Sequence, residues 1–374
     1  MGVRILEVAS IGPGPYAAML MADLGADVLR LERRDASPPR TVNDDLLNRS
    51  RAAIGVDLKT VAGRELVLDL SERADGVIEG FRPGVMERLG LGPDDLLARN
   101  PRLVYGRMTG YGQSGPLSQR AGHDINYIAI SGALWPLGRA GEPPSAPMNL
   151  VGDFGGGALF LVVGVLAGVI AARSTGEGQV VDAAMVDGSA SMLTMMHSFL
   201  NAGSWHEQRG VNILDSGAHF YEVYETSDQK YVAVGAIEAK FYEELLRGLG
   251  LESRDLPAQM DRSQWSTMKD RFASIFATKT RDEWTSIFEH VDACVTPVLS
   301  PREAAHHRYN TERGVFELTP VLQPRPAPRF QRTPGSIKAA SEVGELSTAL
   351  SRWGLSDGDV ESLRAQGVLD DVQV

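Results

Sequence analysis

Short apolar runs alternate with helical segments along the first half of the chain. The run over 3–9 is broken by the Gly/Pro segment 12–15, and a helical pattern over 16–24 leads to a second run over 26–31. A strand, helix and strand joined this tightly predict a right-handed parallel crossover. Further strands and helices of the same sheet are predicted over 62–72, 76–79, 93–98 and 103–105. The pattern indicates a large doubly wound, Rossmann-like α/β domain.

Two longer apolar segments follow, over 156–172 and 181–201, separated by the polar turn 174–178. Both are predicted to be helices. The first has 17 residues and is rich in Gly and Ala. That length is short for a bilayer span, so a buried helix is favoured over a membrane segment.

The pattern changes beyond residue 220, where apolar runs over 220–225 and 231–234 flank a polar turn and predict a hairpin. Helices are predicted over 239–249, 264–277 and 281–290. Together these elements predict a smaller α+β domain. The proline-rich segment 320–340 favours an extended strap, and the helical period over 346–369 is expected to return the chain to the first domain.

These elements divide the 374 residues into two expected domains. The large domain is predicted over 1–200 and is completed by 331–374. Residues 201–225 are predicted to be a linker, and the small domain is predicted over 226–330.

Charge and cysteine content narrow the class of protein. The formal charge of −11 argues against general binding to nucleic acid or to anionic membranes, so any anion site must be built locally. The single cysteine, Cys294, excludes an intrachain disulfide and favours a reducing, cytoplasmic environment. The surrounding segment 292–298 predicts a buried strand, which favours a packing role for Cys294 over a nucleophilic one.

The segment 12–17 has the Gly-x-Gly-x-x-Ala spacing of a dinucleotide-binding turn, and Glu32 follows at the end of the second predicted strand. Such a turn binds pyrophosphate through backbone N–H groups, and Pro13 and Pro15 each remove one of these donors. A proline-fixed turn that starts a helix is therefore favoured. The arginines after Glu32 keep an NADP-dependent enzyme open as an alternative.

Arginines are concentrated from the end of the second predicted strand onward, although the chain as a whole is acidic. Six lie in one segment: Arg30, Arg33, Arg34, Arg40, Arg49 and Arg51. The planar guanidinium fork suits phosphate, so the cluster favours a polyphosphorylated small ligand. For any single one of them, pairing with the four acids of the same segment is the favoured alternative. Arg82 is better placed, because it lies between glycines on a predicted strand-end loop, where α/β proteins bind ligands.

Two titratable side chains lie in glycine-rich segments, His123 within 121–127 and Asp153 within 151–157. Glycine lets a substrate approach the backbone closely, and the ordinary pKa of histidine, about 6.5, lies near neutrality. An imidazole and a carboxylate around one carbon are what proton transfer to and from a carbon acid requires. A hydrogen-bonding histidine and a helix-capping aspartate are the structural alternatives.

These segments, taken together, resemble the family III CoA-transferases, also called the CaiB/BaiF family, and within that family its racemase branch. The matching motifs follow in order over 11–15, 80–85, 107–116, 122–127, 152–157, 178–183, 234–238 and 292–298. The resemblance covers about residues 1–335 and fades in the C-terminal tail.

The resemblance implies a substrate, a 2-methylacyl thioester of coenzyme A. The residues implied for its nucleotide and phosphates are Arg33, Val56, Lys59, Gly80, Phe81, Arg82 and Arg88. Those implied for the thioester end are Gly122, Asp124, Asn126 and Tyr127. No metal and no separate cofactor is implied, because coenzyme A is part of the substrate. Interlocked homodimers are the family's assembly, with each active site between the large domain of one subunit and the small domain of the other.

The racemase branch implies interconversion of (2R)- and (2S)-2-methylacyl-CoA through an enolate. By this resemblance His123 and Asp153 serve as acid and base on opposite faces of C2, and Glu238 orients the histidine. The backbone N–H of Asp124 is expected to meet the enolate charge. Ala239 and Lys240 follow Glu238 where these racemases commonly have Pro-Gln, which puts the local geometry in question.

Two alternatives remain open within this resemblance. In a CoA-transferase the carboxylate matching Asp153 is a nucleophile that attacks the thioester. His123 favours the racemase, because transferases typically have a non-basic aromatic residue there and need no base. A catalytically silent CoA-binding protein is the other alternative, and the presence of all three titratable residues argues against it.

Overall fold

The computed structural model describes residues 2–33, 46–318, 321–338 and 346–371, and the chain forms two compact units. Unit 1 comprises Met1–Ala133, Pro147–Leu193 and Gly314–Val374, and unit 2 comprises Leu134–Ala146 and Thr194–Arg313. This division differs from the predicted boundaries. Leu134–Ala146 and the end of the predicted large domain belong to unit 2, and unit 1 resumes at Gly314 rather than at residue 331.

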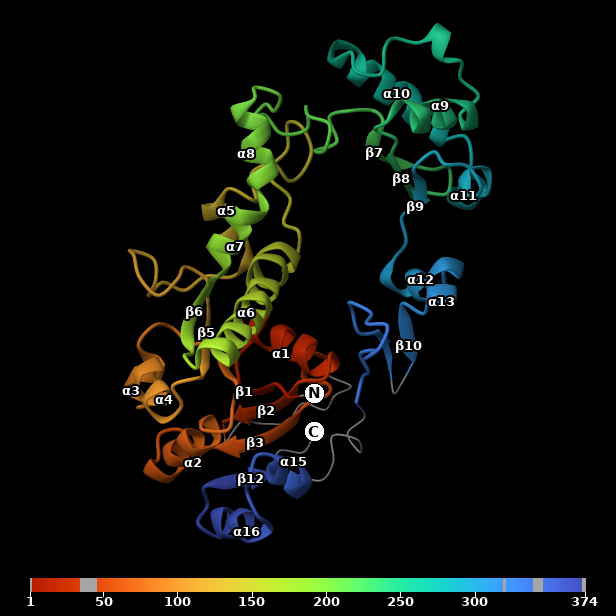
Figure 1. Ribbon diagram of the computed structural model, residues 1–374. Coiled ribbons are helices and arrows are strands. Elements are labelled where there is room, and N and C mark those ends of the chain that lie inside the picture. The colour runs from red at the N-terminus through yellow and green to blue at the C-terminus, as the bar shows by residue number, and fades with distance from the viewer. Residues whose placement is uncertain (1, 34–45, 319–320, 339–345, 372–374) are drawn as a thin grey trace. The chain divides into compact units, whose positions relative to one another are not determined.

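In the described part of unit 1, the central element is a seven-stranded sheet with the order β12-β3-β2-β1-β4-β5-β6 (Figure 1). Its strands are β1 (Arg4–Val8), β2 (Asp27–Glu32), β3 (Ala52–Val56), β4 (Gly76–Glu79), β5 (Val104–Thr109), β6 (Gln179–Ala184) and β12 (Leu369–Asp371). Neighbouring strands are parallel except for β12, which pairs antiparallel with β3. The predicted doubly wound α/β sheet is therefore confirmed, with its strand order reversing between β1 and β4.

Helices cover both faces of this sheet. They are α1 (Pro13–Asp23), α2 (Val61–Ser71), α3 (Val85–Arg88), α4 (Pro93–Arg99), α5 (Asp124–Ser131), the π-helical segment η2 (Leu150–Leu159), α6 (Phe160–Thr175), α7 (Met185–Met192), α15 (Leu346–Arg352) and α16 (Asp357–Ala365). Strand β1 shows why two cores form. Ile5 faces the core with α1 and α6, while Leu6 and Val8 face the core that receives Trp353 from the C-terminal segment.

The helix α6 approaches the sheet closely because glycines face it. A Cβ at Gly168 would lie 2.9 Å from Val104, and one at Gly164 would lie 2.6 Å from Val181. The opposite side of α6 is exposed, so the predicted buried helix is buried on one side only. Within the described residues, Leu150–Thr175 is long and apolar enough to cross a membrane, a criterion that core helices also meet.

Three predictions at element level need correction. Residues Gln179–Ala184 form strand β6 rather than the start of a helix, and the helical part that follows is divided at Leu193. Cys294 is exposed and precedes the short strand β9 (Val295–Pro297), which is not buried. The predicted strap over 320–340 contains the short strand β11 (Leu322–Pro324), which pairs antiparallel with β10 (Phe316–Leu318) just before the strap, and is otherwise irregular backbone where described.

Unit 2 is built on the antiparallel sheet β7-β8-β9, in which β7 (Tyr221–Glu225) and β8 (Tyr231–Gly235) form the predicted hairpin. Its helices are α8 (Thr194–Asn201), α9 (Ala239–Gly248), α10 (Trp265–Phe276), α11 (Arg281–Phe288), α12 (Pro301–His306) and α13 (Arg308–Arg313). The core of this unit is aromatic, with Phe220, Phe272, Phe276 and Trp284 buried together. Alternating burial along β7 and β8 is what a sheet with one covered face produces.

A histidine lies inside this aromatic core. His219 is 1% exposed, and its Nε2 is 2.8 Å from the hydroxyl of Tyr242. Its Nδ1 has no hydrogen-bond partner, and the ring of Phe272 lies edge-on to it. Burial lowers the pKa of His219 to about 4, and the positive charge of Lys269 adds to the decrease.

This histidine predicts an acid-sensitive fold. The folded state favours the neutral ring. Its contribution to the free energy of unfolding is therefore fully present above the unfolded pKa of about 6.5 and is lost as the pH falls from there toward 4. The loss is expected to reach about 3 kcal/mol. Urea unfolding at pH 7 and pH 4.5, followed by tryptophan fluorescence, measures it. The variant His219→Gln should flatten this dependence, and an equally steep dependence in the variant would assign the titration elsewhere.

Candidate active site

A cavity of about 600 Å³ lies at the carboxyl ends of β1, β4 and β5, within unit 1. The strand order reverses here, and open α/β sheets bind ligands at such points. Seven of the predicted site residues line it: Gly80, Phe81, Arg82, Gly122, His123, Tyr127 and Asp153. The fold therefore brings the predicted acid and base of unit 1 into one cavity together with the Gly80–Arg82 turn.

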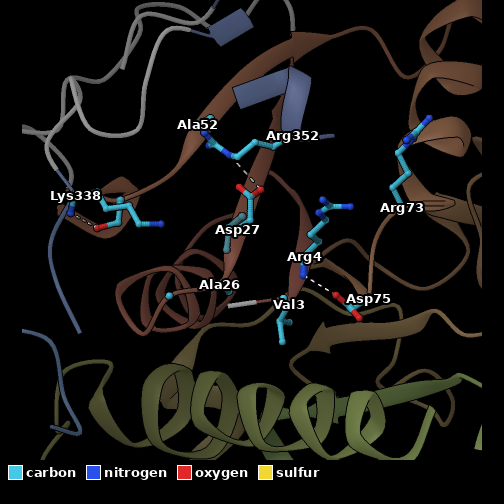
Figure 2. Close-up of a pocket in the computed structure, with 13 residues that line it drawn as sticks. Val3, Arg4, Ala26, Asp27, Ala52, Arg73, Asp75, Lys338 and Arg352 are labelled. Atoms are coloured by element: carbon cyan, nitrogen blue, oxygen red, sulfur yellow. Dashed lines mark hydrogen bonds and ion pairs between the residues drawn. The ribbon is translucent and has the colours of Figure 1, made fainter. Parts of the chain in front are cut away.

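A second cavity, of about 660 Å³, lies at the amino ends of the strands and carries no comparable chemistry (Figure 2). Its two carboxylates are engaged. Asp75 accepts the backbone N–H of Arg4 at 2.8 Å, and Asp27 pairs with Arg352 at 3.3 Å. Two of its cations, Arg73 and Arg352, lie at the carboxyl ends of helices α2 and α15, where positive charge is stabilising. The described residues that line it include no histidine, and the first cavity is the candidate site.

His123 is placed by the start of helix α5. It occupies the N-cap position in an extended conformation, and its backbone N–H donates to the side chain of Asn126 at 3.1 Å. The imidazole itself is exposed and lines the cavity. The predicted ligand residue Asn126 therefore contributes to the placement of His123 rather than to the cavity lining.

Asp153 lies in the π-helical segment η2 and is half-buried. Its carboxylate accepts a hydrogen bond from the amide of Asn149 at 3.3 Å. Burial raises the pKa of Asp153, and the neighbouring Asp124 carboxylate raises it further, while the Asn149 amide and His123 oppose the rise. A carboxyl group with a raised pKa can act as both base and acid nearer neutrality.

The backbone around Asp153 is fixed by a second carboxylate. Asp124 is 5% exposed, and its Oδ2 accepts the backbone N–H of Asp153 at 2.7 Å. The neighbouring ring of Phe154 stacks on Tyr16, with 4.4 Å between centroids. π-Helical turns are rare and occur frequently at functional sites. Here the wide turn presents Asp153 to the cavity, with its own backbone N–H and the ring of Phe154 both anchored.

The start of helix α1, next to Asp153, argues against a dinucleotide-binding turn. Gly12 precedes helix α1 with φ of 69°, and a Cβ there would lie 3.0 Å from the carboxylate of Asp153. The helix then starts with Pro13 and has Pro15 in its first turn. A pyrophosphate at this helix end would meet a carboxylate and lack two backbone donors, so the glycines serve close packing instead.

Tyr127 forms one wall of the cavity and is 8% exposed. Its hydroxyl donates to the carbonyl of Gly122, and its ring lies edge-on to Tyr111 with 4.9 Å between centroids. A Cβ at Gly110 would lie 2.0 Å from this ring, so only glycine fits there. Burial raises the pKa of Tyr127 to about 12, which keeps its hydroxyl a hydrogen-bond donor.

The other implied ligand residues lie around the carboxyl edge but outside this cavity. Arg33 follows β2 and is exposed, as are Lys59 and Arg88 on later elements. Val56 ends β3 with its side chain 1% exposed, so only its backbone could face a ligand. Their contact with a ligand stays a prediction.

The basic cluster is largely structural where it is described. Arg30 and Arg51 pair with Glu7, which is fully buried, at 2.7 and 3.2 Å. Arg49 pairs with Asp23 at 2.6 Å. Arg34 and Arg40 lie outside the described residues. A phosphate-binding face is therefore wrong for Arg30, Arg49 and Arg51, because acids from β1 and α1 already neutralise them.

Glu238 lies in unit 2, where it occupies the N-cap position of helix α9 without a side-chain capping hydrogen bond and is exposed. His123 and Asp153 lie in unit 1. The predicted orientation of His123 by Glu238 therefore stays a prediction. Among the described residues no group of three or more His, Cys, Asp and Glu side chains forms a metal site.

Three supporting residues were missed by sequence reasoning: Asn149, Glu79 and Arg107. Asn149 precedes Asp153 by four residues, a spacing that brings side chains together on a helix and could have indicated the pair. Glu79 and Arg107 lie opposite each other on β4 and β5. No local pattern indicates that register, because it depends on the assembled sheet.

Known proteins are similar to this chain over nearly its whole length. The family model described as CoA-transferase family III matches residues 1–344. Alpha-methylacyl-CoA racemase of Mus musculus is 44% identical over 374 residues, covering 99% of this chain and 97% of the relative. The Homo sapiens protein of the same name is 43% identical over 378 residues, covering 100% and 98%.

A solved structure supports the fold independently. A CaiB/BaiF family protein from Brucella suis superposes with a TM-score of 0.77 at 23% identity, covering 94% of this chain and 98% of that one. The same family is thus indicated by the predicted resemblance, by the fold and by the full-length relatives. The chain belongs to the family III CoA-transferases.

Proposed function

We propose that this protein is a racemase that interconverts the (2R) and (2S) forms of 2-methylacyl-CoA thioesters. The observation that carries the proposal is that His123 and Asp153, a basic and an acidic side chain, line one cavity at the switch point of the sheet. The two mammalian relatives named alpha-methylacyl-CoA racemase support it at 43–44% identity over their full length.

The chemistry follows from two groups on opposite faces of C2. One removes the C2 proton as a base, and the electron pair left on carbon delocalises onto the thioester oxygen as an enolate. The other donates a proton to the opposite face, which restores the C–H bond with inverted configuration. In the reverse direction the groups exchange roles. A raised pKa suits Asp153 to this, since it must be protonated in one direction and ionised in the other.

The enolate oxygen needs hydrogen-bond donors. Helix α5 begins at Asp124, directly after His123, and first-turn N–H groups of a helix have no acceptor within the helix. The N–H of Asp124 would therefore face developing negative charge, with the positive end of the helix dipole behind it. Glu238 is proposed to orient His123 by accepting its second ring N–H.

The rival within the family is acyl transfer, in which Asp153 attacks the thioester carbonyl. The observation that favours the racemase is the imidazole of His123 in the same cavity, because transfer to a carboxylate acceptor needs no base there. The transferase remains the second candidate on the basis of Asp153 and family membership.

Solvent isotope incorporation tests the proposal. A single stereoisomer of a 2-methylacyl-CoA in deuterated water is expected to gain one deuterium at C2 as it epimerises, without an acyl acceptor. Mass spectrometry measures the deuterium, and chiral separation after hydrolysis measures the epimer. Retention of the C2 proton, together with transfer of CoA to an added carboxylate, would select the transferase instead.

The proposed assembly is an interlocked homodimer. Apolar side chains on the outer side of η2 and α6 are exposed, at 47% for Leu159, 67% for Val163 and 71% for Ile170. Monomeric proteins rarely expose a continuous apolar stripe of this kind, and a second copy of the chain would cover it. Light scattering after gel filtration is expected to give twice the chain mass of 40.4 kDa, and a monomer at micromolar concentration would contradict it.

A further inference from the structure

A buried carboxylate, Glu79, ends strand β4 directly before the turn Gly80–Pro83, whose residues line the cavity. Glu79 is 2% exposed and does not itself line the cavity. Each of its oxygens has one partner. Oε2 accepts the backbone N–H of Phe81 at 2.7 Å, and Oε1 accepts the Nε–H of Arg107 at 3.1 Å. The carboxylate therefore connects the backbone of the turn to the neighbouring strand.

Arg107 extends this connection to the far end of the turn. It lies opposite Glu79 in the parallel pairing of β4 with β5 and is 6% exposed. Its Nη1 donates at 2.7 Å to Glu87 of helix α3, which follows the turn. Gly80 packs against Ser10, where an added Cβ would lie 3.0 Å away. The turn is thus held at Phe81, at α3 and against the loop after β1.

Stability alone does not account for this arrangement. Removing two charges from water is costly, and a buried ion pair is often no better than apolar side chains of similar volume. Burial raises the pKa of Glu79 to about 7 in spite of Arg107 and the Phe81 N–H, which shows how strongly the site opposes a charge. Apolar replacements could fill the space, but they could not accept the N–H of Phe81.

We propose that Glu79 is a positioning residue that holds Phe81 and Arg82 in the arrangement that binds the coenzyme A part of the substrate. The inference rests on the proposed function, because it assigns the turn to coenzyme A. Glu79 acts through the backbone of the turn and touches neither the acyl group nor the reacting carbon.

The variant Glu79→Gln tests this assignment. The amide has the same shape, but one of its two ends is an NH₂ group that must face either the N–H of Phe81 or the guanidinium of Arg107. We expect the Kd for coenzyme A and the KM for the thioester to rise roughly tenfold, with kcat changed less than about threefold, since one charge-assisted hydrogen bond is lost. Calorimetry measures Kd. Amide hydrogen exchange should show faster exchange at Phe81.

A double variant separates positioning from stability. Glu79→Leu with Arg107→Met removes both charges together and is expected to recover the melting temperature lost in Glu79→Leu alone. The N–H of Phe81 still lacks an acceptor, so KM and Kd should stay raised. Glu65→Gln is the matched control. It removes an exposed carboxylate of α2 that pairs with Arg99 outside this network, and should leave Kd near the wild-type value.

Recovery of Kd together with melting temperature in the double variant would show a merely structural role and overturn the inference. Unchanged Kd and unchanged exchange at Phe81 in Glu79→Gln would overturn it as well. The proposed function fails separately. A wild-type protein that binds coenzyme A without epimerising the thioester removes the racemase assignment, yet leaves the Kd and exchange comparisons valid.

Discussion

Replacement of His123 by alanine is expected to abolish epimerisation while coenzyme A still binds. General acid–base catalysis by one side chain contributes about 10²- to 10⁴-fold, and epimerisation needs proton transfer on both faces, so kcat should fall at least 10³-fold. The Kd for coenzyme A should change little, because the imidazole lies on the cavity wall formed by the start of α5 and not on the Gly80–Arg82 turn. Chiral analysis of the product and calorimetry measure the two effects.

A sharper result comes from isotope exchange with each stereoisomer. With His123 absent, Asp153 can still remove and return a proton on its own face. The variant should therefore exchange C2 hydrogen for deuterium in one stereoisomer, without epimerising either. His290→Ala, which removes an exposed histidine of unit 2, is the control and should retain full turnover. Unchanged turnover in His123→Ala would remove this residue from the mechanism.

Asp153→Asn is expected to cause a loss of similar size, at least about 10³-fold in kcat, because the amide can neither accept nor donate the C2 proton at neutral pH. The amide oxygen can still accept from Asn149, so the fold of η2 should survive. Isotope exchange should now persist in the other stereoisomer, the one that His123 deprotonates. If His123→Ala and Asp153→Asn exchange the C2 hydrogen of opposite substrate stereoisomers, the result establishes which group serves which face.

The pH dependence of the wild type provides a further check on Asp153. Burial raises the pKa of Asp153. As the solution is acidified, turnover of the stereoisomer that Asp153 deprotonates should therefore begin to decline at a higher pH than it would with an aspartate of ordinary pKa.

The control for the Asp153→Asn substitution is Asp69→Asn, which changes an exposed carboxylate of α2 and should retain full turnover. Loss of isotope exchange in both substrate stereoisomers with the Asp153→Asn variant would contradict the division of roles between Asp153 and His123.

Local patterns were sufficient where each element has its own signal. The Gly/Pro break after β1 and the apolar runs predicted the β1, α1 and β2 unit, and β4 lies at its predicted residues. The family motifs indicated His123 and Asp153, which line the same cavity. Strand β6 was missed because its apolar residues run without interruption into those of helix α7, so no change of period marks the boundary.

Tertiary partners account for most of what sequence reasoning could not predict. Arg49 looked available for phosphate, and only the assembled fold places the carboxylate of Asp23 at 2.6 Å from it. The pairing of Glu79 with Arg107 depends on the register of β4 against β5. Cys294 is exposed just before β9, a three-residue strand at the edge of its sheet rather than the longer buried strand predicted. Such contacts join residues far apart in the chain, which no local period reports.

The division into units limits how the protein can be separated into fragments. The chain changes unit after Ala133, Ala146, Leu193 and Arg313. One cut by a protease at any of these places leaves both units linked by the remaining connections. Neither unit corresponds to a single stretch of gene that could be expressed alone or transplanted whole.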